Sequence, residues 1–219
     1  MIDAGFEYRL ERPSGVADCV VVLLHGSGRD EHDLLAFGRA VFPNALLYAM
    51  RGAIPWQSGF AFFRRKPDRQ LDVDDLKAQA ARLCTFMDFV TQQTGQTPFL
   101  VGYSNGAIMA AEMICQDCSR AQGAILLRPL SPRRNEELPS LSGFPVLLLA
   151  ASHDERREPN DAQDLAAQFV TAGADVCLEV LDGGHGWAED AADEKLSRQM
   201  AGDQKTGLIR AAALPPTIL

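Results

Sequence analysis

Short apolar runs recur along the chain, each bounded by glycine, proline or aspartate. The first of them reads CVVVLL and contains no charged side chain. Runs of this length and composition are typical of strands that are buried on both faces of a parallel sheet. We therefore predict strands at Cys19–Leu24, Ala45–Met50, Pro98–Val101, Gly123–Leu127, Pro145–Ala151 and Asp175–Leu181.

Segments with helical periodicity separate these runs. In the clearest one, apolar side chains fall on a single stripe, at Leu76, Ala80, Leu83, Met87 and Val90. Asp72, Asp74 and Asp75 stand at its start, where the helix dipole favours negative charge, and Gly95 is placed to end it. Further helices are predicted over Asn105–Cys118, Asp161–Ala172 and Asp190–Met200.

Strands that alternate with helices form βαβ units, so the expected class is α/β, with a mostly parallel, doubly wound sheet covered by helices on both faces. The chain has 219 residues, of which 47% are hydrophobic and 23% charged, as in an ordinary globular protein. The turn-rich stretch from Arg128 to Phe144 is too short for a second domain or a helical cap. We expect a single domain over residues 1–219.

The net charge and the cysteine content indicate which partners and which cellular compartment to expect. The net charge is −8, and an acidic surface repels phosphate backbones, so no nucleic acid is expected as a partner. No apolar run is long enough for a membrane span or a secretory signal, and the scattered cysteines suit reduced thiols, so we expect a cytoplasmic protein. Cys115 and Cys118 form a C-x-x-C without a second pair; packing is expected there rather than a metal site.

A candidate nucleophile follows the third of the predicted strands. That strand runs into Gly102-Tyr103-Ser104-Asn105-Gly106, a G-x-S-x-G pattern, and a predicted helix follows at once. A turn this sharp strains the serine backbone and needs small residues on either side of Ser104. Because parallel sheets form their sites at the carboxyl ends of strands, this context predicts a catalytic serine.

The loop after the first predicted strand, Leu24-His25-Gly26-Ser27-Gly28, is a candidate oxyanion hole. Its glycines allow backbone N–H groups to face a ligand, and we expect the N–H of Ser27 and that of Asn105 to be the two donors. His25 lies inside this loop and is poorly located to take a proton from Ser104. We expect it to order the loop.

A base and an acid are expected later in the chain. His185 follows a predicted strand in a glycine-rich turn, so it is the candidate base, whereas His32 and His153 are not. Asp154 closes the run VLLLAASHD and is the candidate acid. The alternatives are weaker, since Asp161 begins a helix and suits an N-cap, while Asp182 is close to its own histidine along the chain.

Residues that contact the substrate are harder to infer. With no helical lid we expect an open pocket, and its apolar lining is expected from the loop after Arg51, with Leu130 as a further candidate; the loop residues are Trp56, Phe60, Phe62 and Phe63. Arg64 and Arg65 could bind a carboxylate or phosphate or simply form a solvated turn. The tail from Thr206 to Leu219 could pack on a partner or be loose.

Several motifs together resemble a known family. The chain resembles the α/β-hydrolase fold and, within it, the phospholipase/carboxylesterase family that contains the acyl-protein thioesterases. The resemblance is carried by LHGSGRDEHDLL, GYSNGA, GGHGW and the RG…FFRR stretch from Arg51 to Arg65. GYSNGA is similar to a small bacterial branch, some members of which are described around hydroquinone resistance. The resemblance implies Ser104, Asp154 and His185 as a triad that needs no cofactor. The acid loop departs from the family pattern, because Pro159 follows Asp154 one residue later than usual and the intervening residues are charged.

The expected function is that of a carboxylesterase that cleaves a small-molecule ester through an acyl-enzyme on Ser104. Thioesterase, lysophospholipase, peptidase and carbon–carbon bond hydrolase activities remain open, as does a non-catalytic binding protein that has kept the hydrolase fold. We expect a monomer or a homodimer.

Overall fold

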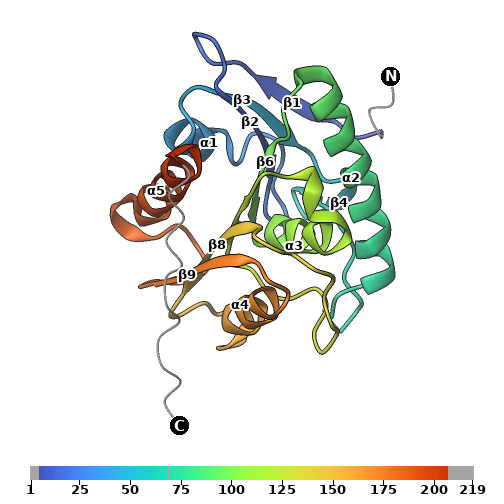
Figure 1. Ribbon diagram of the computed structural model, residues 1–219. Coiled ribbons are helices and arrows are strands. Elements are labelled where there is room, and N and C mark those ends of the chain that lie inside the picture. The colour runs from blue at the N-terminus through green and yellow to red at the C-terminus, as the bar shows by residue number, and fades with distance from the viewer. Residues whose placement is uncertain (1–4, 69, 207–219) are drawn as a thin grey trace.

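A seven-stranded sheet lies between two layers of helices in the computed structural model, which describes residues 5–68 and 70–206 (Figure 1). The strand order is β1-β3-β2-β6-β7-β8-β9, with β1 antiparallel to β3 and the other pairs parallel. The strands are β1 (Tyr8–Glu11), β2 (Cys19–Leu24), β3 (Ala45–Met50), β6 (Phe99–Tyr103), β7 (Ala124–Leu127), β8 (Pro145–Ala151) and β9 (Asp175–Leu181). A separate hairpin consists of β4 (Ile54–Trp56) and β5 (Gly59–Ala61).

The two helix layers have different members. α2 (Val73–Thr94), α3 (Asn105–Asp117) and α4 (Asp161–Thr171) cover one face of the sheet, and α1 (Leu35–Val41) and α5 (Ala192–Thr206) cover the other (Figure 1). Single 3₁₀ turns lie at Cys118–Arg120 and Glu189–Ala191. As its sequence predicts, α2 begins where Asp72 accepts a hydrogen bond from the Asp75 N–H, and it ends at Gly95 in the left-handed conformation.

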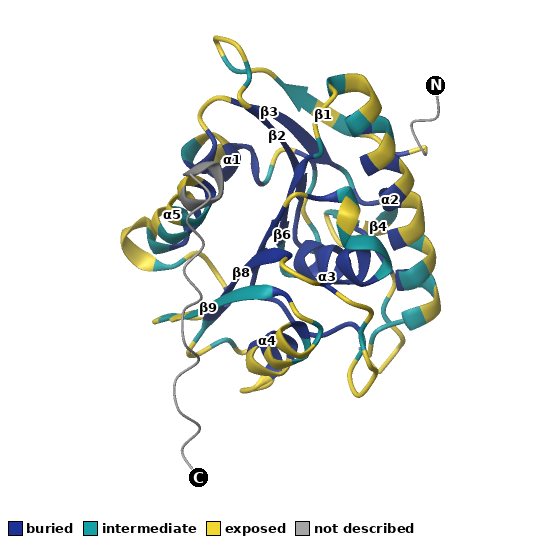
Figure 2. Ribbon diagram, viewed as in Figure 1, coloured by how far each residue is buried: buried dark blue, intermediate teal, exposed yellow. Residues whose placement is uncertain are grey.

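Alternation along the buried strands divides the core in two. In β2, Val20, Val22 and Leu24 pack against the layer of α2, α3 and α4, while Cys19, Val21 and Leu23 pack against that of α1 and α5. The period of two is set by the pleat of the strand, which points successive side chains to opposite faces. Both sets are buried, so β2 needs apolar residues throughout, and Figure 2 shows the central strands buried along their length.

The order of the strands fixes where a site can form. The chain passes from β2 through α1 to β3 on one side of β2, and later returns with β6 on the other side. The connections after β2 and β6 therefore leave toward opposite faces of the sheet and open a crevice between them. The loop that begins at His25 and the turn at Ser104 both lie at this point.

The fold predicted from the sequence is confirmed. All the predicted strands and helices are present within a few residues, and α5 continues to Thr206. The segment 128–144 between β7 and β8 contains no helix, so no helical cap lies there. β1 and the β4–β5 hairpin were not predicted, and the expectation for the tail falls mostly on residues 207–219, outside the described part. Within the described part, no helix is long and apolar enough to span a bilayer.

Candidate active site

Ser104 stands at a strained turn between β6 and α3. Its φ is 53° and its ψ is −104°, a conformation that costs free energy in a residue with a side chain. The Ser104 N–H donates to the carbonyl of Leu127 at 2.8 Å, which fixes the turn against β7. A Cβ at Gly102 would lie 2.4 Å from the Gly106 carbonyl oxygen, and one at Gly106 only 2.0 Å from that of Leu24. Both positions therefore need glycine, as the sequence predicts.

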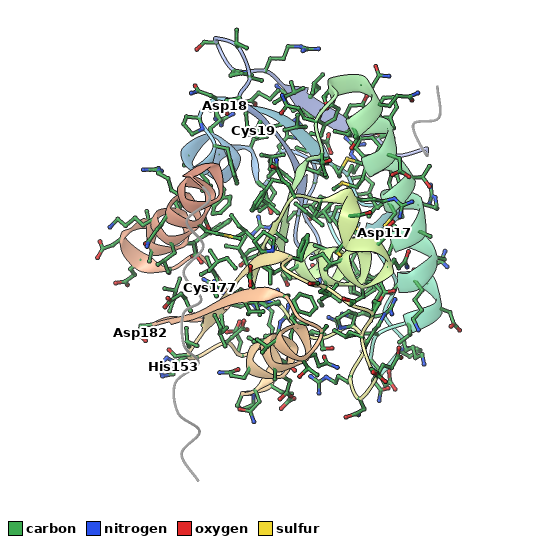
Figure 3. All side chains as sticks on the ribbon, in the orientation of Figure 1. Asp18, Cys19, Asp117, His153, Cys177 and Asp182 are labelled. Atoms are coloured by element: carbon green, nitrogen blue, oxygen red, sulfur yellow. The ribbon has the colours of Figure 1, made fainter. Side chains whose placement is uncertain are left out.

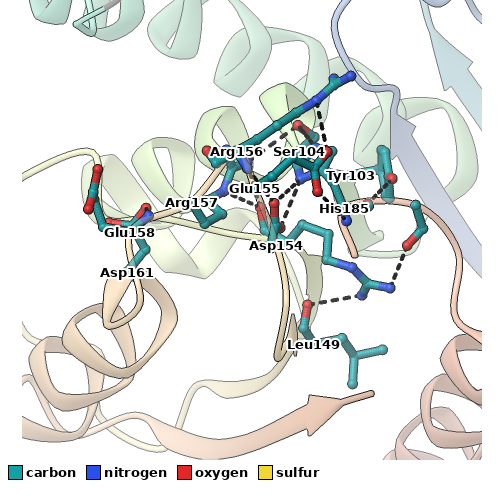
Figure 4. A network of polar contacts seen from close by, with 12 residues as sticks. Tyr103, Ser104, Leu149, Asp154, Glu155, Arg156, Arg157, Glu158, Asp161 and His185 are labelled. Carbon is teal, nitrogen blue, oxygen red and sulfur yellow. Dashed lines mark hydrogen bonds and ion pairs between the residues drawn. The ribbon is translucent and has the colours of Figure 1, made fainter. Parts of the chain in front are cut away.

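Three side chains from distant parts of the chain meet at this turn (Figure 4). His185 Nε2 lies 2.8 Å from Ser104 Oγ, and His185 Nδ1 lies 2.8 Å from each carboxylate oxygen of Asp154. Asp154 follows β8 and His185 follows β9, and their side chains are 4% and 7% exposed. The longer, charged acid loop thus still brings its aspartate to the histidine.

The two alternative acids lie elsewhere. Asp161 begins α4, where it accepts hydrogen bonds from the Glu158 N–H and from Arg134. Asp182 is 96% exposed and lies 3.5 Å from His153, at the outer end of β8 and β9 (Figure 3). Neither carboxylate is hydrogen-bonded to His185.

The loop that carries His185 is held by its neighbours on three sides. Tyr103 Oη donates to the His185 carbonyl at 2.5 Å, and the Tyr103 ring stacks on Trp187 at 5.0 Å between centroids. Arg128 Nη2 donates to the Gly186 carbonyl at 2.8 Å. Arg128 is itself fixed by a buried bidentate ion pair with Asp193 at the start of α5. The imidazole is therefore oriented by side chains from β6, the end of β7 and α5.

His185 has the protonation behaviour of a base. Burial lowers its pKa below the ordinary value of 6.5, the hydrogen bond with Asp154 raises it, and the positive charge of Arg157 lowers it further. The imidazole is therefore mostly neutral at neutral pH, with the Nδ1 proton directed at Asp154. Nε2 is left free to accept the proton of Ser104.

His25 orders the candidate oxyanion loop, as expected. Its Nε2 accepts a hydrogen bond from the Gly52 N–H at 3.0 Å, so its proton lies on Nδ1, which is 2.7 Å from the Gly26 carbonyl. Burial lowers the pKa of His25, which keeps the ring neutral in these two bonds. His25 is 1% exposed and both of its ring nitrogens are bonded to backbone groups, so neither is available to take a proton from Ser104.

The two predicted oxyanion donors belong to segments that lie next to Ser104. Gly26 is close to the serine, because a Cβ there would lie 3.7 Å from Ser104 Cβ, and Ser27 is the next residue along. The Gly28 N–H donates to the Phe60 carbonyl at 2.9 Å, so it is not available to an oxyanion. Asn105 is the first residue of α3, so its N–H has no partner within the helix. Its side-chain oxygen accepts from the Phe62 N–H at 2.8 Å and fixes the helix start.

Three of the predicted substrate-lining residues belong to the core instead. Phe62 and Phe63 are 0% and 1% exposed, and Leu130 is 8% exposed in the same cluster. The sequence does not show whether the rings of two adjacent loop phenylalanines point into the core or toward a ligand. In the structure the rings pack in the core on the side of the sheet that α2 and α3 cover. Trp56, at 40% exposed, and the half-buried Phe60 remain available to a ligand.

The two arginines that follow Phe63 differ in environment. Arg64 is exposed and lies beside Asp75 of α2, with its N–H donating to that carboxylate at 2.7 Å. Arg65 is half-buried, and burial lowers its pKa. Arg64 therefore interacts with the start of α2, while the positive charge of Arg65 acts on Arg157, whose pKa it lowers.

Sequence reasoning missed Arg157. Its Nη2 lies 3.3 Å from Ser104 Oγ, and its Nε and Nη2 donate to the Arg128 carbonyl at 2.9 and 2.6 Å. Burial lowers the pKa of Arg157 to about 10, which still leaves it charged at neutral pH. Its only signal in the sequence was the charged, lengthened loop after the acid.

A cavity of about 420 Å³ adjoins the acid loop. Asp154, Arg157 and Pro159 line it on one side, and Pro129 and Val180 on another. None of the aromatic residues predicted to line a pocket borders this space. The cavity thus lies behind the acid, between β8, β9 and the start of α4, and not on the side of the β4–β5 hairpin.

One group of potential metal ligands occurs in the described part of the chain. Asp30, Glu31 and His32 place their ligand atoms within 4.8 Å of one another. Glu31 already binds Arg51 through both carboxylate oxygens at 2.5 Å, and this bond lowers the pKa of Glu31 to about 2. Cys115 is buried, which raises the pKa of its thiol to about 12 and suits the expected packing role.

A parallel sheet of this order, with a serine at a strained turn after β6 and a histidine after the last strand, defines an α/β hydrolase. Residues 57–208 match the dienelactone hydrolase family, and the chain belongs to that family. MhqD of Bacillus subtilis (strain 168), which is named as a hydrolase, is 34% identical over 183 residues, covering 82% of this chain and 92% of MhqD.

Solved structures of carboxylesterases share the fold. The Bacillus cereus carboxylesterase superposes with a TM-score of 0.83 at 27% identity, covering 91% of this chain and 95% of that one. A carboxylesterase from Mesorhizobium loti gives 0.83 at 28% identity, covering 90% and 94%. The predicted α/β-hydrolase resemblance is confirmed, and the protein is an enzyme of the carboxylesterase type.

Proposed function

We propose that the protein cleaves small carboxylic esters through an acyl-enzyme on Ser104, with His185 as base and Asp154 as its partner. The observation that carries the proposal is the unbroken chain of 2.8 Å contacts from Ser104 Oγ through His185 to the carboxylate of Asp154. A neutral imidazole that accepts from the serine and donates to a buried carboxylate is the arrangement that activates a hydroxyl.

The proposed reaction has two halves. Ser104 Oγ attacks the ester carbonyl and passes its proton to His185 Nε2, which gives that proton to the departing alcohol oxygen. Water then attacks the acyl carbon, loses a proton to His185, and the C–Oγ bond breaks as Oγ takes this proton back. The N–H groups of Ser27 and Asn105 are proposed to bind the oxyanion in both halves. No cofactor takes part in these steps.

Fluorophosphonate labelling tests the proposal directly. Wild-type protein should be labelled once per chain at Ser104 and should hydrolyse short p-nitrophenyl esters, while Ser104→Ala should do neither. Thr94→Ala, a change of similar size at the far end of α2, serves as the control and should behave as wild type. Wild-type protein that resists the label and cleaves no ester would contradict the proposal.

The proposal names the class of substrate, a carboxylic ester, and not a particular compound. A thioesterase or a lysophospholipase would use the same three side chains, so these activities differ from the proposal only in the substrate. Matched oxygen esters and thioesters of acetate, butyrate and octanoate separate the alternatives. We propose that the short oxygen esters give the highest kcat/KM, because Phe62, Phe63 and Leu130 are buried in the core and leave only the partly exposed Trp56 and Phe60 of the predicted apolar lining available to an acyl chain.

A further inference from the structure

The guanidinium of Arg157 is the one cationic group, among the described residues, that is hydrogen-bonded to Ser104 Oγ. The serine hydroxyl has one proton and two lone pairs. Its proton is directed at His185 Nε2, and one lone pair accepts from Arg157 Nη2 at 3.3 Å. The remaining lone pair is free to attack. Arg157 therefore fixes the rotation of the nucleophile as well as placing positive charge beside it.

Backbone carbonyls hold the guanidinium in place. Nε and Nη2 share the Arg128 carbonyl, and Nη1 donates to that of Arg156 at 3.0 Å. Arg128 is a rigid anchor, because its side chain is 1% exposed and forms the buried ion pair with Asp193. These carbonyl oxygens bind the N–H groups without a full negative charge of their own, and the carboxylate of Asp154 acts on Arg157 electrostatically, so Arg157 remains a cation beside Ser104.

We propose that Arg157 is a further catalytic residue: its guanidinium donates to Ser104 Oγ and stabilises the negative charge on this oxygen as it attacks and again as it leaves. The inference rests on the proposed function. In the first half of the reaction Oγ gains charge as its proton moves to His185. In the second half the C–Oγ bond breaks and its electron pair returns to Oγ, which is then protonated by His185. Charge-assisted hydrogen bonds strengthen as the acceptor becomes negative.

The same charge has an opposing effect on the base. A cation near His185 disfavours the imidazolium that forms during attack, and Arg157 is among the groups that lower the pKa of His185. The charged or titratable groups around this imidazole are Asp154, Glu155, Arg156 and Arg157 from the acid loop, Tyr103 from β6, and the Arg128–Asp193 pair beside Gly186. Removal of Arg157 should therefore slow the reaction and also raise the pKa of His185.

Substitution of Arg157 tests the inference on the full chain. Arg157→Met should lower kcat/KM for p-nitrophenyl acetate by about 10-fold to 100-fold, the effect of losing one hydrogen bond to a charged group. Both the pre-steady-state burst and the steady-state rate should fall, because Oγ is the nucleophile in one and the leaving group in the other. The acidic limb of the kcat/KM profile should move to higher pH.

Two further variants distinguish an effect of the positive charge of Arg157 from an effect of its hydrogen bonds on the shape of the loop. Arg157→Lys keeps the charge but cannot bridge the Arg128 carbonyl, and it should recover part of the lost rate. Arg39→Met removes an exposed arginine of α1 that pairs with Glu11 of β1, and it should stay within about twofold of wild type. The extent of fluorophosphonate labelling, measured after the reaction has gone to completion, gives the fraction of each variant that has a folded site.

The outcomes are distinct. The inference is overturned if Arg157→Met keeps kcat/KM within twofold of wild type. It is also overturned if Arg157→Lys and Arg157→Met lose the same rate with the acidic limb unmoved, because the arginine would then only support the loop. Failure of the wild-type protein itself to become labelled would instead remove the proposed function, whatever the variants do.

Discussion

At the scale of single residues, the arrangement depends on which nitrogen of His185 carries the proton. Both oxygens of Asp154 face Nδ1 at 2.8 Å, and the Arg156 N–H donates to the same carboxylate at 2.9 Å. An ionised carboxylate accepts hydrogen bonds and cannot donate, so it selects the tautomer with a proton on Nδ1. Nε2, which faces Ser104, then has no proton and can only accept a hydrogen bond.

Asp154→Asn tests this dependence. The amide has nearly the same shape, but its NH₂ group can donate to Nδ1 and favour the tautomer with the proton on Nε2. The expected result is a fall in kcat of about 10⁴-fold with little change in stability. Steady-state hydrolysis of p-nitrophenyl acetate measures it, with Asp182→Asn as the matched control at an exposed aspartate. A fall of less than about tenfold would show that Asp154 is not the partner of His185.

The residues of the site differ in how far the sequence reveals them. Ser104 and His185 stand between glycines directly after apolar runs, so their positions at strand ends follow from local pattern. Arg128 and Arg157 carry no such signal, because charged residues in a loop usually lie in solvent. The burial of Arg128 depends on Asp193, whose place beside it is fixed only by the packing of α5 against the sheet, and Arg157 in turn is held by the backbone carbonyl of Arg128.

At the scale of elements, the site depends on how closely α3 approaches the sheet. The Gly106 N–H donates to the His25 carbonyl at 3.1 Å, so the first turn of α3 lies directly against the end of β2. This contact holds the start of α3, where Asn105 lies, close to the loop with Ser27. A side chain between α3 and β2 would separate the two proposed oxyanion donors.

Gly106→Ala should therefore disrupt the fold around the site. The added methyl would overlap the backbone carbonyl of Leu24 at 2.0 Å, and backbone on both sides leaves no room for adjustment. We expect a loss of unfolding free energy of about 3 kcal/mol or more, at the upper end for overpacking, together with loss of activity. Urea denaturation measures the loss. Gly15→Ala, where a Cβ meets nothing within 4 Å, is the control; equal stability of the two variants would refute the argument.

The elements that the sequence did not reveal are those without a local signal. β1 is a partly exposed edge strand of four residues, so it lacks the continuous apolar run of the central strands. β4 and β5 have three residues each and are defined by their pairing with each other. The central strands were predictable because burial between two helix layers demands apolar side chains at every position.

The last helix is joined to the sheet by a buried charge pair. Arg128 and Asp193 are each 1% exposed, and Asp193 also accepts from the Ala188 N–H at 2.8 Å. Asp193→Ala should cost about 3–5 kcal/mol, because it leaves the Arg128 charge buried without its partner. Removal of Glu11, whose exposed partner is Arg39, should cost under about 1 kcal/mol. Urea denaturation of both variants tests the contrast, and similar losses would contradict it.

At the scale of the whole molecule, stability depends on pH through two buried histidines. Burial lowers the pKa of both His25 and His185 below 6.5, so below this pH the unfolded chain binds more protons than the folded one. Stability therefore falls as the pH drops below 6.5 toward the folded-state pKa values. Glu31 adds to the loss only below about pH 4.5, since its folded-state pKa is about 2. Asp33 acts in the opposite direction, because burial raises its pKa above 3.8.

The window just below pH 6.5 separates these contributions. Most carboxylates remain ionised there, so the histidines dominate and the net charge of −8 at pH 7 changes little through other groups. We expect the free energy of unfolding in urea to be lower at about pH 5.5 than at about pH 7.5. His25→Gln, which keeps an acceptor for the Gly52 N–H, should reduce this difference, whereas His153→Gln, at a side chain 78% exposed, should not. A protein equally stable at both pH values would show that neither histidine is held neutral by the fold.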